Sequence, residues 1–194
     1  MLRTKVWRIL MILALSWMPL NAPIATTTGG VDPELRQALM RAVNDSSSFN
    51  DRFHAEVWLL DMSTRLQRFI EDDRERINLL RNIHQEATRA DLPPELVLAV
   101  IDTESAFNRW AISVVGAQGL MQVMPFWLKE IGREGDNLFS VKTNLRFGCT
   151  ILKHYLDKEK GDLRRALARY NGSIGKAKYP NKVFKKLRTR WFRP

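Results

Sequence analysis

Apolar residues recur at three- and four-residue steps along much of the chain, which is the spacing of one face of an α-helix. Over residues 55–87 this pattern predicts helix, with an interruption around the charged residues 71–74. The apolar positions of the stretch are Leu59, Met62, Leu66, Phe69, Ile77, Leu80 and Ile83. Few strands are visible in the pattern, so we expect a mainly α-helical fold.

Local signals predict further helices on both sides of this stretch. Proline fits the first helical turn, where its missing N–H costs nothing, so Pro93 and Pro94 mark a helix start. We also expect helices over residues 33–43, 126–131, 143–157 and 163–170, the last capped by Asp162.

The helix that starts near residue 93 ends at a single acid. Val97, Val100, Ile101 and Glu104 share one helix face, whereas Asp102 falls on a different face, where we expect solvent to hold it ionised. Burial raises the pKa of a carboxyl group, which suits a general acid working near neutral pH. The spacing alone leaves two interpretations of Glu104 open, a catalytic acid or a structural carboxylate in the core or at the helix end.

The segment after Glu104 is rich in glycine and amide side chains. The 25 residues 105–129 contain no Asp or Glu. Gly116 and Gly119 allow a tight turn, and Gln118 and Gln122 can donate and accept hydrogen bonds among apolar neighbours. Such a loop can line a cleft, and a plain hairpin turn packed on the core is the alternative interpretation.

Three motifs occur in a fixed order in this part of the chain. They are Glu-Ser-x-Phe-Asn at 104–108, Gly-Ala-x-Gly-Leu-Met-Gln-x-Met-Pro at 116–125, and Ala-Arg-Tyr-Asn-Gly at 168–172. Together they resemble the catalytic domain of the soluble lytic transglycosylases over residues 72–183, and the resemblance extends to Asn144, Gly148 and the pair Tyr179-Pro180. It departs at Gly172-Ser173, where that family often has Ala-Gly.

The resemblance implies a fold, a substrate and a set of site residues. The fold would be lysozyme-like, a single domain of the α+β lysozyme superfamily with extra N-terminal helices, and the substrate would be the glycan strands of peptidoglycan. Glu104 would be the catalytic acid/base. The groups that position the sugar would be Ser113, Gln122, Met124, Tyr170 and Asn171. An ordinary core tyrosine with a satisfied hydroxyl is the alternative interpretation of Tyr170.

The carboxylate inventory is compatible with this chemistry. Glycosidases that use water usually need two carboxylates flanking the bond, and no obvious second acid lies near Glu104 in the sequence. A lytic transglycosylase needs one, because the C6 hydroxyl of the substrate attacks and leaves a 1,6-anhydro-N-acetylmuramic acid end on the cleaved MurNAc-GlcNAc strand. The alternatives are a muramidase resembling goose-type lysozyme and a non-catalytic wall-binding or assembly factor.

The N-terminus predicts export. Arg3, Lys5 and Arg8 precede an apolar run over residues 9–18 that is shorter than the ~20 residues of a membrane span. We therefore expect a signal peptide over 1–25 and a periplasmic or secreted protein, not a lipoprotein. A linker and helical extension over 26–71, a catalytic domain over 72–183 and a basic C-terminal tail over 184–194 complete the predicted division.

The chain is strongly basic, with a formal net charge of +10 and no acid after Asp162. In an exported protein, the basic C-terminus suits anionic wall polymers or a membrane surface rather than nucleic acid, and a simply solvated end is the alternative. Cys149 is expected to be a buried, inert thiol. The three histidines make no metal-ligand spacing, so we expect no metal, no cofactor and a monomer.

Overall fold

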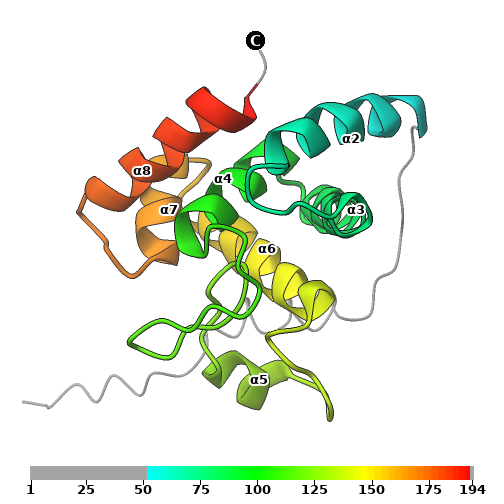
Figure 1. Cartoon of the computed structure of the whole chain (residues 1–194). Coiled ribbons are helices and arrows are strands. Elements are labelled where there is room, and N and C mark those ends of the chain that lie inside the picture. Colours follow the sequence, from blue (N-terminus) through cyan, green and yellow to red (C-terminus); the bar gives the residue numbers. More distant parts are fainter. Residues whose placement is uncertain (1–51, 193–194) are drawn as a thin grey trace, which may run out of the picture. The chain divides into compact units, whose positions relative to one another are not determined.

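The computed structural model describes residues 52–192, without the side chains of residues 52–57 and 131. The predicted signal peptide 1–25, the short helix 33–43 and the part of the predicted linker and extension 26–71 before residue 52 lie outside the described residues. The helices, shown in Figure 1, are α2 Arg52–Leu66, α3 Asp73–Arg89, α4 Pro94–Glu104, α5 Phe126–Ile131, α6 Val141–Lys158, α7 Leu163–Tyr170, α8 Lys178–Lys186 and the π-helix η1 Leu187–Trp191.

The local signals placed the helices to within a few residues: the break predicted at residues 71–74 lies at 67–72, and the helix predicted over 143–157 spans 141–158. α2 and α3 are separated at residues 67–72, and the Asp72 side chain accepts a hydrogen bond from the Glu75 N–H to start α3. Pro94 stands in the first turn of α4, and Asp162 accepts from the Arg165 N–H at the start of α7. Within residues 52–192 the β-structure consists of two isolated bridges, from Gln118 to Ile112 and to Val123. The mainly helical prediction is therefore confirmed.

Helix α4 lies in the middle of the described body, between α3 on one side and α8 with η1 on the other (Figure 1). Every residue from Leu96 to Asp102 is buried. A helix that is apolar all round needs cover on every side, which is why the neighbouring helices surround this one. The fold thereby places the last residue of α4, Glu104, partly buried at the edge of the core.

The segment after residue 183 is folded as far as Trp191. α8 continues into η1, and the indole of Trp191 is fully buried, with its ring centroid 5.4 Å from that of Phe107. The described part of the predicted tail 184–194 thus packs on α4 as part of the helical body. The apolar pattern did not predict α8 and η1, because many basic residues separate their buried positions Tyr179, Val183 and Trp191.

Two further observations concern the described residues. Cys149 is fully buried, as expected. None of the helices in residues 52–192 is long and apolar enough to cross a membrane.

Candidate active site

Glu104 is held at the point where α4 meets the loop that follows it. The Ser105 N–H caps the helix by donating to the Ile101 carbonyl at 3.0 Å, and the Ser105 hydroxyl lies 2.8 Å from the Leu120 carbonyl oxygen. Ala106 and Phe107 then adopt positive φ angles of 48° and 65°, which turn the chain away from the helix axis. The end of α4 and the loop are therefore tied together directly beside the acid.

The carboxyl group of Glu104 is largely enclosed and has a phenol as its hydrogen-bond partner. The Tyr179 hydroxyl, which comes from α8, donates to Glu104 Oε1 at 2.6 Å. Burial raises the pKa of Glu104 to about 7, although the Tyr179 hydrogen bond and the charge of Lys186 both lower it. The direction of this shift agrees with the prediction from helix spacing, and its size leaves the group partly protonated at neutral pH.

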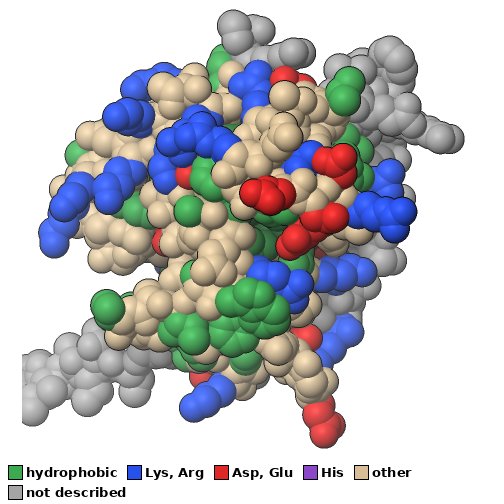
Figure 2. All heavy atoms as spheres, in the orientation of Figure 1, with side chains coloured by type: hydrophobic (Ala, Val, Ile, Leu, Met, Phe, Trp, Pro, Cys, Tyr) green, Lys and Arg blue, Asp and Glu red, His purple; other side chains and the backbone are tan. Residues whose placement is uncertain are grey.

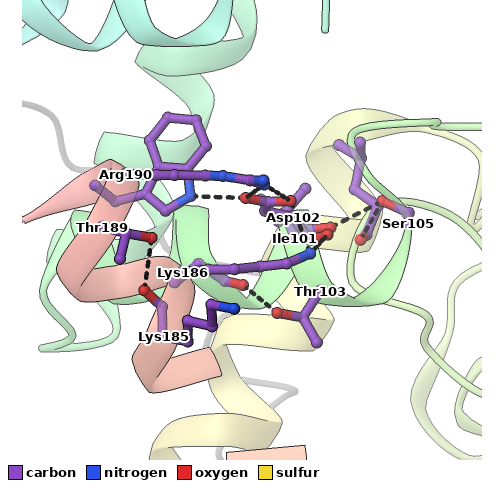
Figure 3. A network of polar contacts seen from close by, with 11 residues as sticks. Ile101, Asp102, Thr103, Ser105, Lys185, Lys186, Thr189 and Arg190 are labelled. Atoms are coloured by element: carbon purple, nitrogen blue, oxygen red, sulfur yellow. Dashed lines mark hydrogen bonds and ion pairs between the residues drawn. The ribbon is translucent and has the colours of Figure 1, made fainter. Parts of the chain in front are cut away.

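Asp102 contradicts the prediction that solvent holds it ionised. Its side chain is 1% exposed. Figure 3 shows that Lys186 and Arg190 of the C-terminal helices bond it. Lys186 Nζ lies 2.8 Å from Oδ1 and also bonds the Asp102 carbonyl, Arg190 Nη1 lies 2.8 Å from Oδ2, and Trp191 Nε1 donates to Oδ2. Burial raises the pKa of Asp102, but the hydrogen bonds from Lys186 and Arg190 outweigh it and hold the pKa below its usual value.

The loop after Glu104 is hydrogen-bonded to Asn144 of α6. Asn144 is 1% exposed; its Oδ1 accepts from the Met121 N–H, and its Nδ2 donates to the carbonyls of Gln118 and Leu138. Gly119 has a φ of 76°, and a Cβ there would overlap the Asn144 amide. The hydrogen-bonded asparagine and the glycine together fix the shape of the loop.

Two of the predicted sugar-positioning residues hold the loop together. The Ser113 hydroxyl accepts from the Ala117 N–H at 3.0 Å. The Gln122 amide donates to the carbonyls of Ala111 and Gly119. Met124 is partly buried against the core. The cleft-lining interpretation of this loop is compatible with Figure 2, where the surface is hollowed between the loop and the α7–α8 region.

The Tyr170 hydroxyl donates to the carbonyl of Met121 at 2.8 Å, not to Glu104. The hydroxyl is thus satisfied by the backbone of the loop, as the alternative interpretation of Tyr170 required. The phenol that contacts the Glu104 carboxyl is that of Tyr179. Tyr170 nevertheless braces the backbone one residue before Gln122.

A pocket of about 300 Å³ opens beside the acid. Its lining includes two of the predicted site residues, Glu104 and Asn171, together with Thr103, Ser173, Lys176, Lys178, Tyr179 and Lys182. Sequence reasoning missed Tyr179 and the three lysines as site residues. The signal for Tyr179 was its place in the family pattern, which carried no indication of what it contacts. Among residues 52–192 no group of three or more His, Cys, Asp or Glu is arranged to hold a metal ion.

The chain is similar in sequence to proteins named as transglycosylases. It is 38% identical over 104 residues to "Transglycosylase" of Enterobacteria phage PRD1, covering 50% of this chain and 38% of that protein. It is 32% identical over 111 residues to "Membrane-bound lytic murein transglycosylase C" of Yersinia pestis, covering 48% of this chain and 30% of that protein. The chain therefore spans less than two fifths of the length of these curated relatives.

The comparison with solved structures finds an inactive mutant of lytic transglycosylase Slt from Pseudomonas aeruginosa, with 30% identity and a TM-score of 0.45 over 58% of this chain and 18% of that chain. Residues 81–191 match the sequence model of the family described as "Transglycosylase SLT domain". This match covers more than half of the chain and contains Glu104, the loop after it, Tyr170 and Tyr179. The chain belongs to the transglycosylase SLT domain family.

Proposed function

We propose that this protein is a peptidoglycan lytic transglycosylase that cleaves the MurNAc-GlcNAc β-1,4 bond without water, with Glu104 as its single acid/base. The observation that carries the proposal is the contrast between Glu104 and three acids whose side chains are at most 6% exposed. Asp102, Glu86 and Glu159 are each bonded by two Arg or Lys side chains. Glu104 is bonded by a neutral phenol and has a pKa of about 7.

This contrast matters because an ion pair holds a carboxyl group ionised. A general acid must carry a proton when substrate binds and must release it in the transition state, so a pKa near the working pH is the useful value. The ion pairs of the other three acids support a structural role for them. Family membership supports the same assignment, because Glu104 opens the first of the three motifs.

In the first proposed step, protonated Glu104 donates its proton to the glycosidic oxygen as the C1–O4 bond breaks. The substrate's N-acetyl group stabilises the positive charge that develops at C1. The Tyr179 hydroxyl donates to Glu104 Oε1 and thereby stabilises the carboxylate that the step creates.

In the second step, the Glu104 carboxylate takes the proton of the C6 hydroxyl while O6 bonds to C1. The proton has then moved from O6 to O4 through one residue, and no water is consumed. A tethered nucleophile of this kind reaches effective molarities on the order of 10⁵ M or more in favourable cases. The lining of the Glu104 pocket supports a one-carboxylate route, since Glu104 is the only acid among its described residues.

The remaining site residues act by shaping and positioning in this proposal. Ser113 and Gln122 keep the loop backbone in place, Tyr170 braces it from α7, and Met124 offers an apolar contact for a sugar ring. Asn171, at the end of α7, is exposed on the pocket and is free to bond the sugar through its amide. The predicted signal peptide supports action in the periplasm or outside the cell.

Mass spectrometry of the products from purified peptidoglycan tests the proposal. Wild-type protein should release strands that end in 1,6-anhydro-N-acetylmuramic acid, whereas mainly reducing ends would establish the muramidase alternative. Glu104→Gln should fold and lose cleavage, because Gln is nearly isosteric but supplies no proton. Activity above about a tenth of wild type in the folded variant would remove Glu104 from its role. Glycan binding without any products would favour the wall-binding alternative.

A further inference from the structure

The side chain of Asp102 is bonded by three donors, all of them from the C-terminal helices. Lys186 Nζ donates to Oδ1 at 2.8 Å, and Trp191 Nε1 donates to Oδ2 at 3.1 Å. Arg190 Nη1 bonds both oxygens, at 3.1 and 2.8 Å. Figure 3 shows Lys186 and Arg190 reaching this carboxyl group. One buried carboxylate of α4 therefore holds the end of α8 and the π-helix η1.

One face of α8 packs against α4 and carries two polar contacts. Tyr179, Val183 and Lys186 recur at steps of four and three residues, so they share this face, and Val183 is fully buried. At one end of the face the Tyr179 hydroxyl donates to Glu104 Oε1, and at the other end Lys186 bonds Asp102. One contact fixes the position of a helix end, whereas two contacts also fix the direction of the helix.

The direction of α8 matters for the hydrogen bond to the acid. Tyr179 and Lys186 are seven positions apart on α8, which is about 10.5 Å along a helix axis. If α8 tilted by about 5° around its far end, Tyr179 would move by about 0.9 Å. Groups at a reaction centre need to be held within about 0.5 Å, so such a tilt would weaken or break the 2.6 Å bond to Glu104.

Asp102 can influence Glu104 in two ways that have opposite signs. As a negative charge it would raise the pKa of Glu104, whereas by holding the Tyr179 hydroxyl in place it would lower that pKa, because the hydrogen bond favours the carboxylate. The other titratable groups around Glu104 come from α7, from α8 and from the turn before α8. They are Tyr170, Lys176, Lys178, Tyr179, Lys182 and Lys186.

We propose that Asp102 is a positioning residue for the reaction: it anchors the end of α8 and η1 to α4 and thereby holds the Tyr179 hydroxyl on Glu104 Oε1. Asp102 does not line the Glu104 pocket, so it acts through Tyr179 and not on the substrate. The inference rests on the proposed function for the role of Glu104 as the acid. It adds that a carboxylate outside the pocket sets the rate of the reaction.

The titration of Glu104 tests the inference without any substrate. Its pKa is measured in the full chain by NMR of the glutamate carboxyl carbons, and the Glu104→Gln spectrum assigns the signal. Asp102→Asn places an amide donor where Arg190 and Trp191 need an acceptor, so the anchor is lost. We expect the pKa of Glu104 to rise by about 0.5–1 unit, in the same direction as in Tyr179→Phe.

The rise should disappear when Tyr179→Phe is already present, because the hydroxyl that Asp102 positions is then absent. Lys186 does not obscure this comparison, since it also bonds the backbone carbonyl of Asp102, and the substitution keeps that carbonyl. If Asp102→Asn does not fold, Arg190→Gln replaces it, because the Arg190 side chain is 32% exposed and its loss removes only part of the anchor. Its rise in the pKa of Glu104 should likewise disappear with Tyr179→Phe.

Turnover gives the second measurement. kcat and KM on purified peptidoglycan are compared at about pH 5.5, below the pKa of Glu104. Asp102→Asn should lower kcat about fivefold with little change in KM. Combined with Tyr179→Phe, it should lower kcat by less than about a further twofold, because both substitutions remove the same hydrogen bond.

Glu86→Gln is the matched control. The Glu86 side chain is also 1% exposed and is paired with two arginines, Arg89 of α3 and Arg146 of α6. The control should therefore lower the melting temperature as Asp102→Asn does, and it should leave kcat and the pKa of Glu104 at their wild-type values. Equal effects of the two substitutions on kcat would reduce Asp102 to a stabilising residue.

Three further results would overturn the inference. The first is a pKa of Glu104 that falls or stays unchanged in Asp102→Asn, which would leave its charge as the only influence. The second is a rise in this pKa that persists in the presence of Tyr179→Phe, and the third is a loss of kcat that is additive with that of Tyr179→Phe. A failure of the proposed function appears instead as wild-type products without 1,6-anhydro ends, and the titration decides the positioning role in that case as well.

Discussion

We predict that the hydrogen bond from Tyr179 to Glu104 affects the pH dependence of kcat/KM. Its geometry is short, 2.6 Å from Oη to Oε1, and the Tyr179 ring is 8% exposed in a site where phenylalanine would also fit. Tyr179→Phe removes the hydroxyl and keeps the ring. The bond stabilises the ionised form of Glu104, so its loss favours the protonated form and raises the pKa further above about 7.

The size of the effect follows from the energy of such bonds. A hydrogen bond to a charged group contributes about 1.5–3 kcal/mol, and 1.36 kcal/mol corresponds to one pKa unit, so the pKa of Glu104 should rise by about 1–2 units. The same bond stabilises the carboxylate formed when Glu104 gives up its proton. Its loss should therefore also slow turnover by roughly ten- to a hundredfold where both proteins are protonated.

The assay is kcat/KM for release of soluble products from purified peptidoglycan, measured from pH 5 to 10 at constant ionic strength. The alkaline limb of this profile reports the pKa of the acid in the free enzyme. In Tyr179→Phe the limb should move to higher pH by about 1–2 units. The deficit relative to wild type should consequently shrink as pH rises, because the variant keeps its proton longer.

Tyr170→Phe is the matched control. Its hydroxyl bonds the Met121 carbonyl and not the acid, so the alkaline limb should stay at the wild-type position even if turnover falls. An unchanged limb in Tyr179→Phe, accompanied by a lower melting temperature, would refute the reasoning and make Tyr179 a packing residue. A downward shift of the limb would refute the sign of the argument.

Three other predictions concern stability, each measured by urea or thermal unfolding. Glu104→Gln should stabilise the protein at pH 8 by up to about 3 kcal/mol. The folded pKa of Glu104, about 7, exceeds the ordinary 4.5, so the stability of the wild-type protein falls as pH rises through this interval. The gain should disappear below about pH 4.5. A gain that does not change with pH would contradict this. Asp102→Asn should lower the free energy of unfolding by about 2–3 kcal/mol. This is less than for fully buried ion pairs, because the Lys186 and Arg190 side chains are 28% and 32% exposed. A loss below about 1 kcal/mol would show that the Asp102 network contributes little to stability. Gly119→Ala should cost at least twice as much as Gly116→Ala: both glycines have positive φ, of 76° and 85°, but a Cβ overlaps Asn144 only at Gly119 and meets nothing within 4 Å at Gly116. Equal losses would contradict the packing argument.

Much of the fold was accessible from the sequence because its signals are local. A proline pair started α4, Asp162 capped α7, and Asp72, within the predicted interruption, capped α3. Each depends on residues within one or two helical turns, whose geometry the backbone sets without outside help. The same holds for the position of Glu104 on the apolar face of its helix and for the motif order that indicated a lytic transglycosylase.

The helix α8 with η1 escaped prediction for a physical reason. Its basic residues outnumber its apolar ones. The role of Lys186 and Arg190 follows from their bonds to Asp102, which the folded chain places opposite them. The spacing of Asp102 on α4 correctly put it off the Glu104 face, but it could not show that another helix covers that side. Burial is a property of the assembled helices, so a charge pattern alone does not distinguish a solvated end from a packed one.

The sequence and the tertiary structure also determine different parts of the chemistry of the site. The sequence by itself determined which acid ends α4, which glycines turn the following loop, and which family the pattern resembles, because these reside in contiguous residues. Only the tertiary structure decided the state of that acid: the Tyr179 hydroxyl arrives from 75 residues away, and Lys186 arrives from the same helix. A carboxyl pKa is set by desolvation and by nearby charges and donors in space, which the folded chain brings together and the linear order of residues does not specify.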